Sequence, residues 1–240
     1  MKIKAVFFDL DGTLLPMDQD VFVKAYVGGL VRTLAVKGYD PDAVAKALWL
    51  GTSAMVNNDG TKSNEDVFWK SFGSVFGESV RDEEPLLNEF YKTDFQNVKN
   101  FCGFAPESKE IVDMLHTAGI TTVLATNPLF PAIATESRIR WAGLSPDDFT
   151  IYTTYEHNRY CKPNLSYYSD LLERLSLKGE ECVMVGNDVK EDMIASKLGM
   201  KVFLLTDNLI NKDNEDISRY KNGSFSDLKK FIEEIIDAND

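Results

Sequence analysis

The chain has 240 residues, of which 44% are hydrophobic and 27% charged, and its acidic residues exceed its basic ones to give a net charge of −12. Such a chain can bury a sizeable core, and its acidity argues against nucleic acid and against anionic membranes as partners. Three scattered cysteines predict neither a disulfide framework nor a zinc site, and the first residues resemble no leader, so we expect a cytoplasmic protein.

The first predicted element is a buried strand at residues 3–10, an apolar run that ends among acidic residues and a glycine. From about residue 18 to residue 99, apolar residues recur instead at helical spacing and are separated by turn signals. This stretch predicts about four helices and no strand. It therefore indicates a helical bundle that is inserted into another domain.

After residue 101, strands and helices alternate, which is typical of a parallel sheet with helices on both faces. The predicted helices are 108–118, 131–142, 165–175, 189–198 and 226–236, and the predicted strands are 121–125, 150–153, 182–185 and 201–205. The polar stretch 207–221 is expected to be a solvated loop. The fold class is therefore α/β, with a Rossmann-like doubly wound core at 1–16 and 101–240 and an all-α cap at 17–100.

Polar residues follow several of these strands at the point where each strand ends. Asp9, Thr126 and Asp188 stand at or just beyond strand ends, and Lys162 lies in the loop after another short strand. The carboxyl ends of parallel strands share one edge of the sheet, where such sheets bind ligands. We therefore expect these four segments to converge on one crevice.

Asp9 and Asp11 are two carboxylates at one strand end, with Gly12 directly behind them. Asp9 could act as a nucleophile, because a carboxylate can form a covalent phosphoryl intermediate. Asp11 could protonate the leaving oxygen and then deprotonate the attacking water. Two acids beside a bound phosphate need a cation, and Mg²⁺ prefers such oxygen ligands. The alternative interpretation is a polar turn after a strand.

The segment after the predicted strand 182–185 is also acidic. Asp188 is a candidate metal ligand, and Asp192, four residues later on the same predicted helix face, is either a second ligand or a support for the first. The alternative is a helix cap, because Asp188 and Glu191 have the spacing of a capping box.

Two further segments could hold phosphate oxygens. The Thr126 hydroxyl and the main-chain N–H groups that follow it, beginning at Asn127, lie before a predicted helix. Lys162 could supply the positive charge that an acidic site needs. Taken alone, the first segment could be a turn with a helix cap, and the lysine could simply be solvated.

The order and spacing of all four segments resemble the haloacid dehalogenase superfamily, in its phosphatase branch with a helical cap between the first and second motifs. The matching residues are Asp9, Asp11, Gly12 and Thr13 for the first motif, Thr126 for the second, Lys162 for the third, and Asp188 with Asp192 for the fourth. Asn187 stands where relatives often carry glycine or an acidic residue. The resemblance covers the whole chain.

The resemblance implies a role for each residue. Asp9 would be the nucleophile and a Mg²⁺ ligand, Asp11 the general acid and base and a ligand through its main-chain carbonyl, and Asp188 the residue that completes the metal site. Thr126 and Lys162 would bind the transferring phosphoryl group, and we add Gly12 and Asn127 to the predicted phosphate-binding set. Asp192 is included with the metal site.

The expected activity is hydrolysis of a small phosphorylated metabolite. Dehalogenation is disfavoured because Asp11 is present, whereas dehalogenases lack an acid there. A sugar phosphomutase is the main alternative, because it shares the whole catalytic set, and a non-catalytic binding protein on the same fold is a further one.

We expect substrate choice to lie in the cap, for which the loop 57–62 is a candidate, and Trp49, Phe68, Trp69 and Phe72 to form the cap core or its seam with the sheet domain. We also expect the cap to move about linkers near 15–18 and 99–104, unless a large apolar seam fixes it to the sheet domain.

Overall fold

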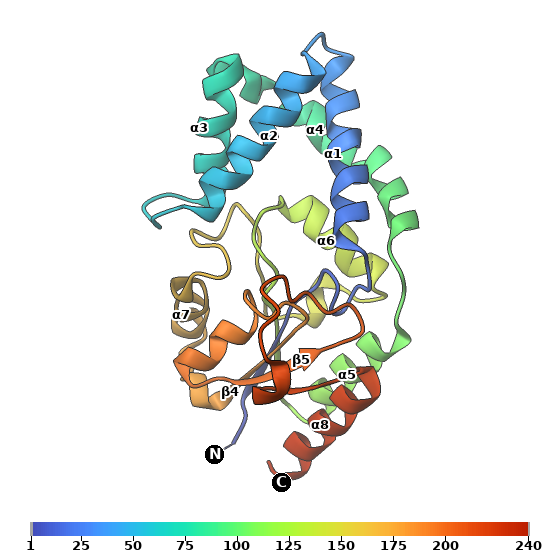
Figure 1. Ribbon diagram of the computed structural model, residues 1–240, viewed down its shortest axis with the longest axis vertical. Coiled ribbons are helices and arrows are strands. Elements are labelled where there is room, and N and C mark those ends of the chain that lie inside the picture. Colours follow the sequence, from blue (N-terminus) through green and yellow to red (C-terminus); the bar gives the residue numbers. More distant parts are fainter. Residues whose placement is uncertain (1, 240) are drawn as a thin grey trace.

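The computed structural model describes residues 2–239 and contains a six-stranded sheet beneath a helical cap (Figure 1). All pairs of neighbouring strands are parallel, and the strand order is β3-β2-β1-β4-β5-β6. The strands are β1 (Ala5–Phe8), β2 (Thr121–Leu124), β3 (Ile151–Tyr152), β4 (Cys182–Gly186), β5 (Lys201–Leu205) and β6 (Lys221–Gly223).

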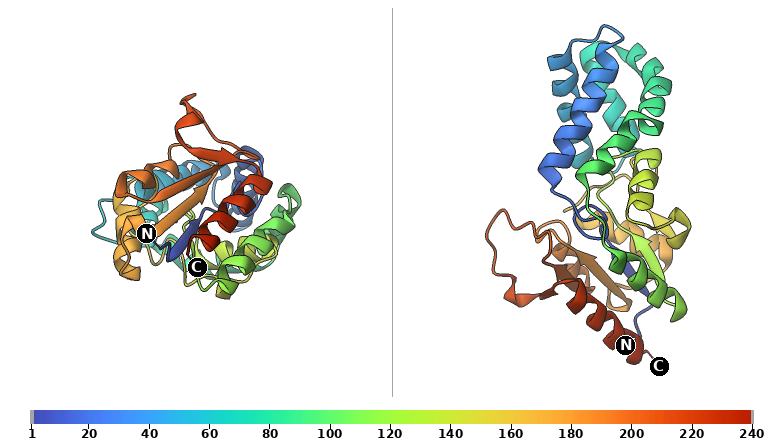
Figure 2. Two further views of the ribbon diagram at one scale, coloured as in Figure 1. Left: turned by 90° about the horizontal axis from the view of Figure 1, so that it is seen from below. Right: turned by 90° about the vertical axis from the view of Figure 1, so that its right-hand side faces the viewer.

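Helices cover both faces of the sheet, which explains why β1 is apolar without interruption. Ala5 and Phe7 pack on the face covered by α7 (Leu165–Leu175), and Val6 and Phe8 pack on the opposite face. That opposite face is covered by α5 (Pro106–Thr117) and α8 (Phe225–Asp237), which lie beside each other in Figure 2. The predicted α/β class with a doubly wound parallel sheet is confirmed.

The strand order reverses at β1, and this reversal positions the site. From β1 the chain continues to β2 and β3 on one side, whereas β4, β5 and β6 extend the sheet on the other side. The carboxyl ends of β1 and β4 are therefore adjacent at the topological switch point, where open α/β sheets bind their ligands.

The cap consists of four α-helices joined by turns and short 3-10 segments. They are α1 (Gln19–Ala35), α2 (Pro41–Val56), α3 (Asn64–Phe76) and α4 (Glu84–Lys92), and the 3-10 helices η1 (Glu78–Glu83) and η2 (Asp94–Phe101) follow α3 and α4. The side chains of Asp18, Asp40 and Ser63 accept main-chain N–H bonds at the starts of α1, α2 and α3. The stretch for which about four helices were predicted therefore contains α1, α2, α3 and α4.

A continuous apolar seam joins the cap to the sheet domain. One cluster of buried side chains runs from Val6 and Phe8 of β1 to Leu34 and Val44 of the cap. At the boundary, the centres of the Phe95 ring in η2 and the Trp141 ring in α6 (Ala132–Trp141) are 4.9 Å apart. This seam counts against the expected hinge motion, because opening the cap would expose apolar surface to water.

Two predicted segments differ in the structure. The predicted helix 189–198 is a turn followed by the 3-10 helix η5 (Met193–Leu198), and the predicted loop 207–221 contains the 3-10 helix η6 (Ile217–Arg219) and leads into the edge strand β6. β6 has no apolar residue, so its pairing with β5 depends on the main chain. The remaining 3-10 helices are η3 (Pro146–Asp148) and η4 (Gly179–Glu181). Among residues 2–239 there is no helix with the length and apolar character needed to span a membrane.

Candidate active site

A buried lysine joins two of the predicted acidic segments at the switch point. The Lys162 ammonium donates to Asp9 Oδ1 at 2.8 Å and to Asp192 Oδ1 at 2.7 Å, and all three side chains are buried. Burial by itself lowers the pKa of Lys162, but the Asp192 and Asp9 carboxylates outweigh it and hold the pKa well above its ordinary value. The site therefore contains a fixed positive charge beside the predicted nucleophile.

The first and fourth acidic motifs are in contact across the adjacent ends of β1 and β4. The Thr13 hydroxyl lies 2.9 Å from Asn187 Oδ1 and 3.4 Å from Asp9 Oδ2. Gly12 has a φ of +86°, and a side chain at this position would collide with the Asn187 amide. The Gly12 N–H donates to Leu15 O at 2.8 Å, and the contact of Gly12 with phosphate stays a prediction.

Asp11 is paired with an arginine that the sequence analysis did not identify. Arg138 lies on α6, is 0% exposed, and directs Nη1 to Asp11 Oδ2. Its guanidinium also lies 4.1 Å from the centre of the Phe130 ring, which holds it from the other side. The sequence offered only a weak signal for this residue, because an arginine within a helix is usually exposed.

Burial raises the pKa of Asp11 to about 6, with Arg138 opposing this shift and the neighbouring Asp9 adding to it. Asp11 Oδ1 is buried and has no hydrogen-bond partner within residues 2–239. A carboxyl group with such a pKa can both donate and accept a proton near neutral pH. This is the property that a general acid and base requires.

Thr126 and Asn127 lie between β2 and α6, beside the lysine. The Thr126 carbonyl accepts bonds from the Thr153 hydroxyl at 2.5 Å and the Tyr167 hydroxyl at 2.8 Å, which fix this turn. The Asn127 side chain accepts from the Lys162 N–H at 3.2 Å and donates to the Glu191 carboxylate at 3.0 Å. The second, third and fourth motifs are thus tied together, and the Asn127 N–H has no acceptor in the part of the chain that the structure describes.

Asp188 and Asp192 use their carboxylates differently. Asp192 Oδ1 accepts from Lys162 and Oδ2 accepts from the Asp188 N–H at 3.0 Å, so both oxygens are engaged. This geometry favours the supporting role for Asp192 over direct ligation of a metal. Asp188 Oδ1 accepts from the N–H groups of Lys190 and Glu191. These are bonds of the kind expected of a helix N-cap, but the segment that follows Asp188 is a turn rather than an α-helix.

Glu191 is a second titratable residue whose environment the sequence did not reveal. Burial raises its pKa to about 8, with Lys162 opposing the shift and the Asp192, Asp188 and Asp9 carboxylates adding to it. Among residues 2–239 its carboxylate has one hydrogen-bonded partner, the Asn127 amide. Its main-chain N–H donates to Asp188 Oδ1, and its main-chain carbonyl accepts from the Tyr168 hydroxyl at 2.8 Å.

The remaining oxygens fit a hard divalent cation. Asp9 Oδ2 receives only the long Thr13 contact, and the Asp11 main-chain carbonyl accepts only a 3.4 Å bond from Gln19. Together with the Asp188 carboxylate, these are the carboxylate and carbonyl ligands that Mg²⁺ prefers. Only two of these ligands are carboxylate side chains, and residues 2–239 contain no cluster of three or more acidic, histidine or cysteine side chains suited to a metal.

Comparison with known proteins places the chain in a family. The family model described as haloacid dehalogenase-like hydrolase matches residues 3–199. A phosphoglycolate phosphatase of Vibrio parahaemolyticus is 28% identical over 196 residues, which cover 81% of this chain and 79% of that protein. A glyceraldehyde 3-phosphate phosphatase of Methanothermobacter thermautotrophicus is 28% identical over 226 residues, which cover 92% of each chain.

Solved structures support the fold. A HAD phosphatase from Thermococcus onnurineus has a TM-score of 0.61 at 21% identity, covering 96% of this chain and 98% of that one. A 2-haloacid dehalogenase from Pseudomonas syringae pv. Tomato has a TM-score of 0.63 at 21% identity, covering 97% and 99%. At this identity the likeness concerns the fold alone. The predicted resemblance to the phosphatase branch of the superfamily is confirmed by the family match and the curated relatives.

Proposed function

Because the chain belongs to the haloacid dehalogenase-like hydrolases, we propose that it is a Mg²⁺-dependent phosphatase that hydrolyses a small phosphate monoester through a phospho-aspartyl intermediate on Asp9. The observation that carries this proposal is the buried contact of Lys162 with Asp9 and Asp192. Lys162 is 153 residues from Asp9 and 30 residues from Asp192 in the sequence. Phosphoryl transfer depends mainly on positioning and charge neutralisation, and this contact supplies both.

In the first step, a carboxylate oxygen of Asp9 attacks phosphorus as the bond between phosphorus and the leaving oxygen breaks. Asp11 donates its proton to the leaving oxygen, so that an alcohol departs. The Lys162 ammonium and the free Asn127 N–H would stabilise the negative charge of the phosphoryl oxygens.

In the second step, water attacks phosphorus and the bond to Asp9 breaks. Asp11, now ionised, accepts the proton of the water, and inorganic phosphate leaves with Asp9 restored. The pKa of about 6 suits both roles, because neither protonation state of Asp11 is strongly disfavoured near neutral pH. Arg138 would hold the carboxylate form between the two steps.

The metal would be held by Asp9, the main-chain carbonyl of Asp11, and Asp188. Bound there, Mg²⁺ would offset the charge of the phosphoryl group and of the two carboxylates. The substrate would be a small phosphorylated metabolite, as the names of the two curated relatives indicate for those proteins. We also propose a cytoplasmic enzyme, supported by three cysteines that are all free thiols.

The test is hydrolysis of an aryl phosphate by wild type and Asp9→Asn, with and without Mg²⁺. Asp113→Asn is a matched control, because Asp113 lies on α5 and its side chain is 55% exposed. We expect Asp9→Asn to be inactive, Asp113→Asn to match wild type, and EDTA to abolish activity reversibly. Asp11→Asn should lower turnover by about 10²–10⁴-fold.

Each outcome bears on a different part of the proposal. Activity that survives Asp9→Asn would exclude Asp9 as the nucleophile, and turnover in metal-free protein would exclude the role of Asp188. Transfer of phosphate to a sugar hydroxyl without release of inorganic phosphate would identify a phosphomutase instead. No activity on any phosphate ester would favour the non-catalytic binding protein.

A further inference from the structure

The cap presents an apolar wall beside the site. This apolar wall is the lining of a cavity between α1, α2, one residue of α3 and the segment that follows the second motif. Its side chains include Val27, Trp49, Met55, Leu129 and Phe130. Trp49 is 55% exposed, which is unusual for so large an apolar side chain. An exposed aromatic side chain in a concave surface indicates a place where a ligand binds.

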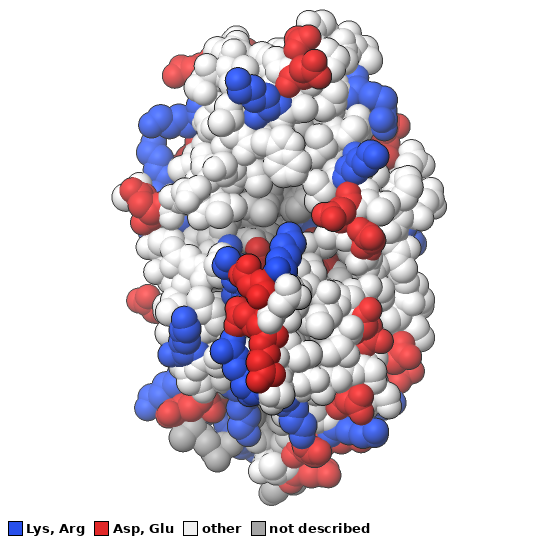
Figure 3. Space-filling view, viewed as in Figure 1, with Lys and Arg blue, Asp and Glu red and all other residues white. Residues whose placement is uncertain are grey.

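The wall begins where the phosphate site ends. Leu129 and Phe130 follow the second motif directly, and the Leu129 N–H donates to the Asn127 carbonyl at 2.8 Å. The Phe130 ring packs on Arg138, which in turn contacts Asp11. Figure 3 shows the hollow between the cap and the sheet domain, with mostly uncharged side chains on its cap side. A phosphate ester held at Asp9 would therefore have this wall available for its organic part.

None of the ten residues that line the wall is charged. Three have side chains with N–H or O–H groups, and two of these groups already have partners: the Tyr26 hydroxyl lies 2.8 Å from that of Tyr91, and the Thr52 hydroxyl donates to Leu48 O at 2.9 Å. The Trp49 indole N–H is the third. The wall thus offers little that could replace water around a charged or hydroxylated group.

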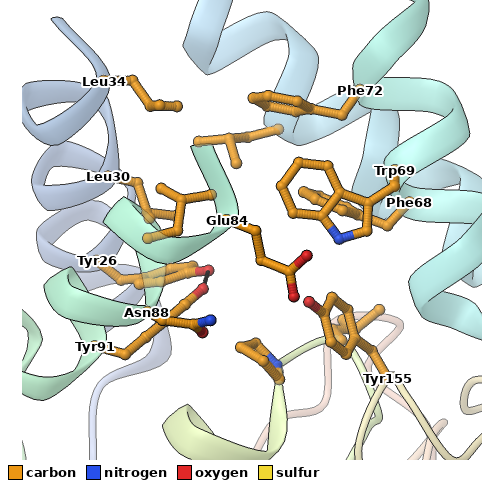
Figure 4. Close-up of a pocket in the computed structure, with 14 residues that line it drawn as sticks. Tyr26, Leu30, Leu34, Phe68, Trp69, Phe72, Glu84, Asn88, Tyr91 and Tyr155 are labelled. Carbon is orange, nitrogen blue, oxygen red and sulfur yellow. Dashed lines mark hydrogen bonds between the residues drawn. The ribbon is translucent and has the colours of Figure 1, made fainter. Parts of the chain in front are cut away.

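Further polar groups of the cap line a second cavity, which shares Tyr26, Leu48, Phe68 and Leu129 with this wall. Figure 4 shows this second cavity, between α1, α3 and α4, into which the Glu84 carboxylate points and where the Tyr26 and Tyr91 hydroxyls meet. The neighbouring hollow at the start of α1 contains Asp18, Asp20 and Lys212, so its charge does not favour an anion.

We propose that this wall receives the leaving group of the phosphate ester and selects one that is uncharged and largely apolar, such as an aryl or alkyl group. The inference rests on the proposed phosphatase function and specifies its substrate class. It separates this chain from a relative whose name indicates phosphoglycolate, a substrate with a carboxylate. A carboxylate on this wall would lose its water without gaining a cation.

The first experiment compares phenyl phosphate with 4-carboxyphenyl phosphate, which differ by one carboxylate on the same ring. We expect kcat/KM to be at least about tenfold higher for phenyl phosphate, the scale of discrimination by an apolar pocket. Glucose 6-phosphate and phosphoglycolate, included as hydroxylated and anionic esters, should be poorer substrates than benzyl phosphate.

Variants then place the effect on the wall. Thr52→Lys introduces a cation there and should raise the relative kcat/KM for the carboxyphenyl ester about tenfold or more. Thr33→Lys is its matched control, because Thr33 is also helical and its hydroxyl also donates four residues back, to Gly29 O at 3.0 Å, but it lies outside the wall. Trp49→Ala should raise KM for phenyl phosphate, whereas Leu50→Ala, at an exposed neighbour outside the wall, should not.

The inference is overturned if the two aryl esters are hydrolysed equally, if the carboxyphenyl ester is preferred, or if Thr33→Lys changes the ratio as much as Thr52→Lys does. Should Thr52→Lys fail to fold, the KM change in Trp49→Ala, whose side chain is largely exposed, decides the same question. A wild-type protein that hydrolyses no ester overturns the proposed function and this inference together. Equal hydrolysis of both aryl esters, abolished by Asp9→Asn, overturns this inference alone.

Discussion

Asn64 provides a sharp test of how the cap is held against the site. It is the first residue of α3 and is 0% exposed. Its Nδ2 donates to Pro128 O at 3.1 Å and to Cys161 Sγ at 3.3 Å, and its Oδ1 accepts from Asn58 Nδ2 at 2.9 Å. One cap side chain therefore links the segments that follow the second motif and precede the third.

The magnitude follows from the partners that Asn64→Ala would leave unpaired. Pro128 O and one N–H of Asn58 lose their bonds inside the protein, and each buried unpaired group costs about 1–3 kcal/mol. We expect the free energy of unfolding to fall by about 2–6 kcal/mol, the sum for the two groups. For a chain of this size, each kcal/mol lowers Tm by about 2–4 °C, so Tm should fall by at least about 4 °C.

The assay is urea unfolding followed by the fluorescence of the buried tryptophans Trp69 and Trp141. Asn57→Ala is the control, since Asn57 is an exposed asparagine nearby whose amide bonds only Ser53 within α2, and its loss should cost about 0.5–1.5 kcal/mol. If Asn64→Ala is no less stable than Asn57→Ala, Asn64 does not link the cap to the site.

Three further predictions use charges and backbone geometry. Arg138→Met leaves Asp11 without its cation and should lower the free energy of unfolding by about 3–5 kcal/mol at pH values where Asp11 is ionised. The loss should be smaller in acid, where Asp11 is protonated. Urea unfolding that shows equal losses above and below the pKa of Asp11 would contradict this. The folded-state pKa of Glu191 is raised, so its stabilising contribution is present in acid and is lost as pH rises through about 8. In EDTA, the stability of wild type relative to Glu191→Gln should therefore fall between about pH 5 and about pH 9, and a constant difference would count against the assignment. Gly12→Ala should cost about 1–3 kcal/mol and most of the activity, measured by thermal unfolding and aryl phosphate turnover, and more than Gly38→Ala, which has a similar φ but open space around it.

The sequence alone was sufficient for the architecture and for the convergence of the candidate site residues at one edge of the sheet. The apolar run before Asp9 predicts a buried strand, and the alternation after residue 101 predicts a parallel sheet, because both patterns follow from local periodicity. The strand-end rule then brings Lys162 to Asp9, as the structure shows. The predicted strand 201–205 and helix 165–175 agree with β5 and α7 at both ends.

Segments whose conformation depends on distant partners were not predictable in this way. Residues 189–198 have helical periodicity, but the Asp192 carboxylate is held by Lys162 and by the Asp188 N–H, and residues 189–192 form a turn. A side chain at Gly186 would collide with Asp192, so the close packing of these two segments requires glycine at position 186. β6 was missed because its pairing with β5 involves only the main chain.

The sequence by itself determined which chemical groups are present, their order, and that strand ends would collect them at one edge of a sheet. Only the tertiary structure decided how the acids are paired: Asp192 contacts the Lys162 ammonium, and Asp11 contacts Arg138, which is 127 residues away in the chain. It also decided that the ten residues that line the apolar wall are uncharged. The physical reason is that pairing and desolvation depend on distances between residues that are remote in the chain. A local pattern contains no information about those distances.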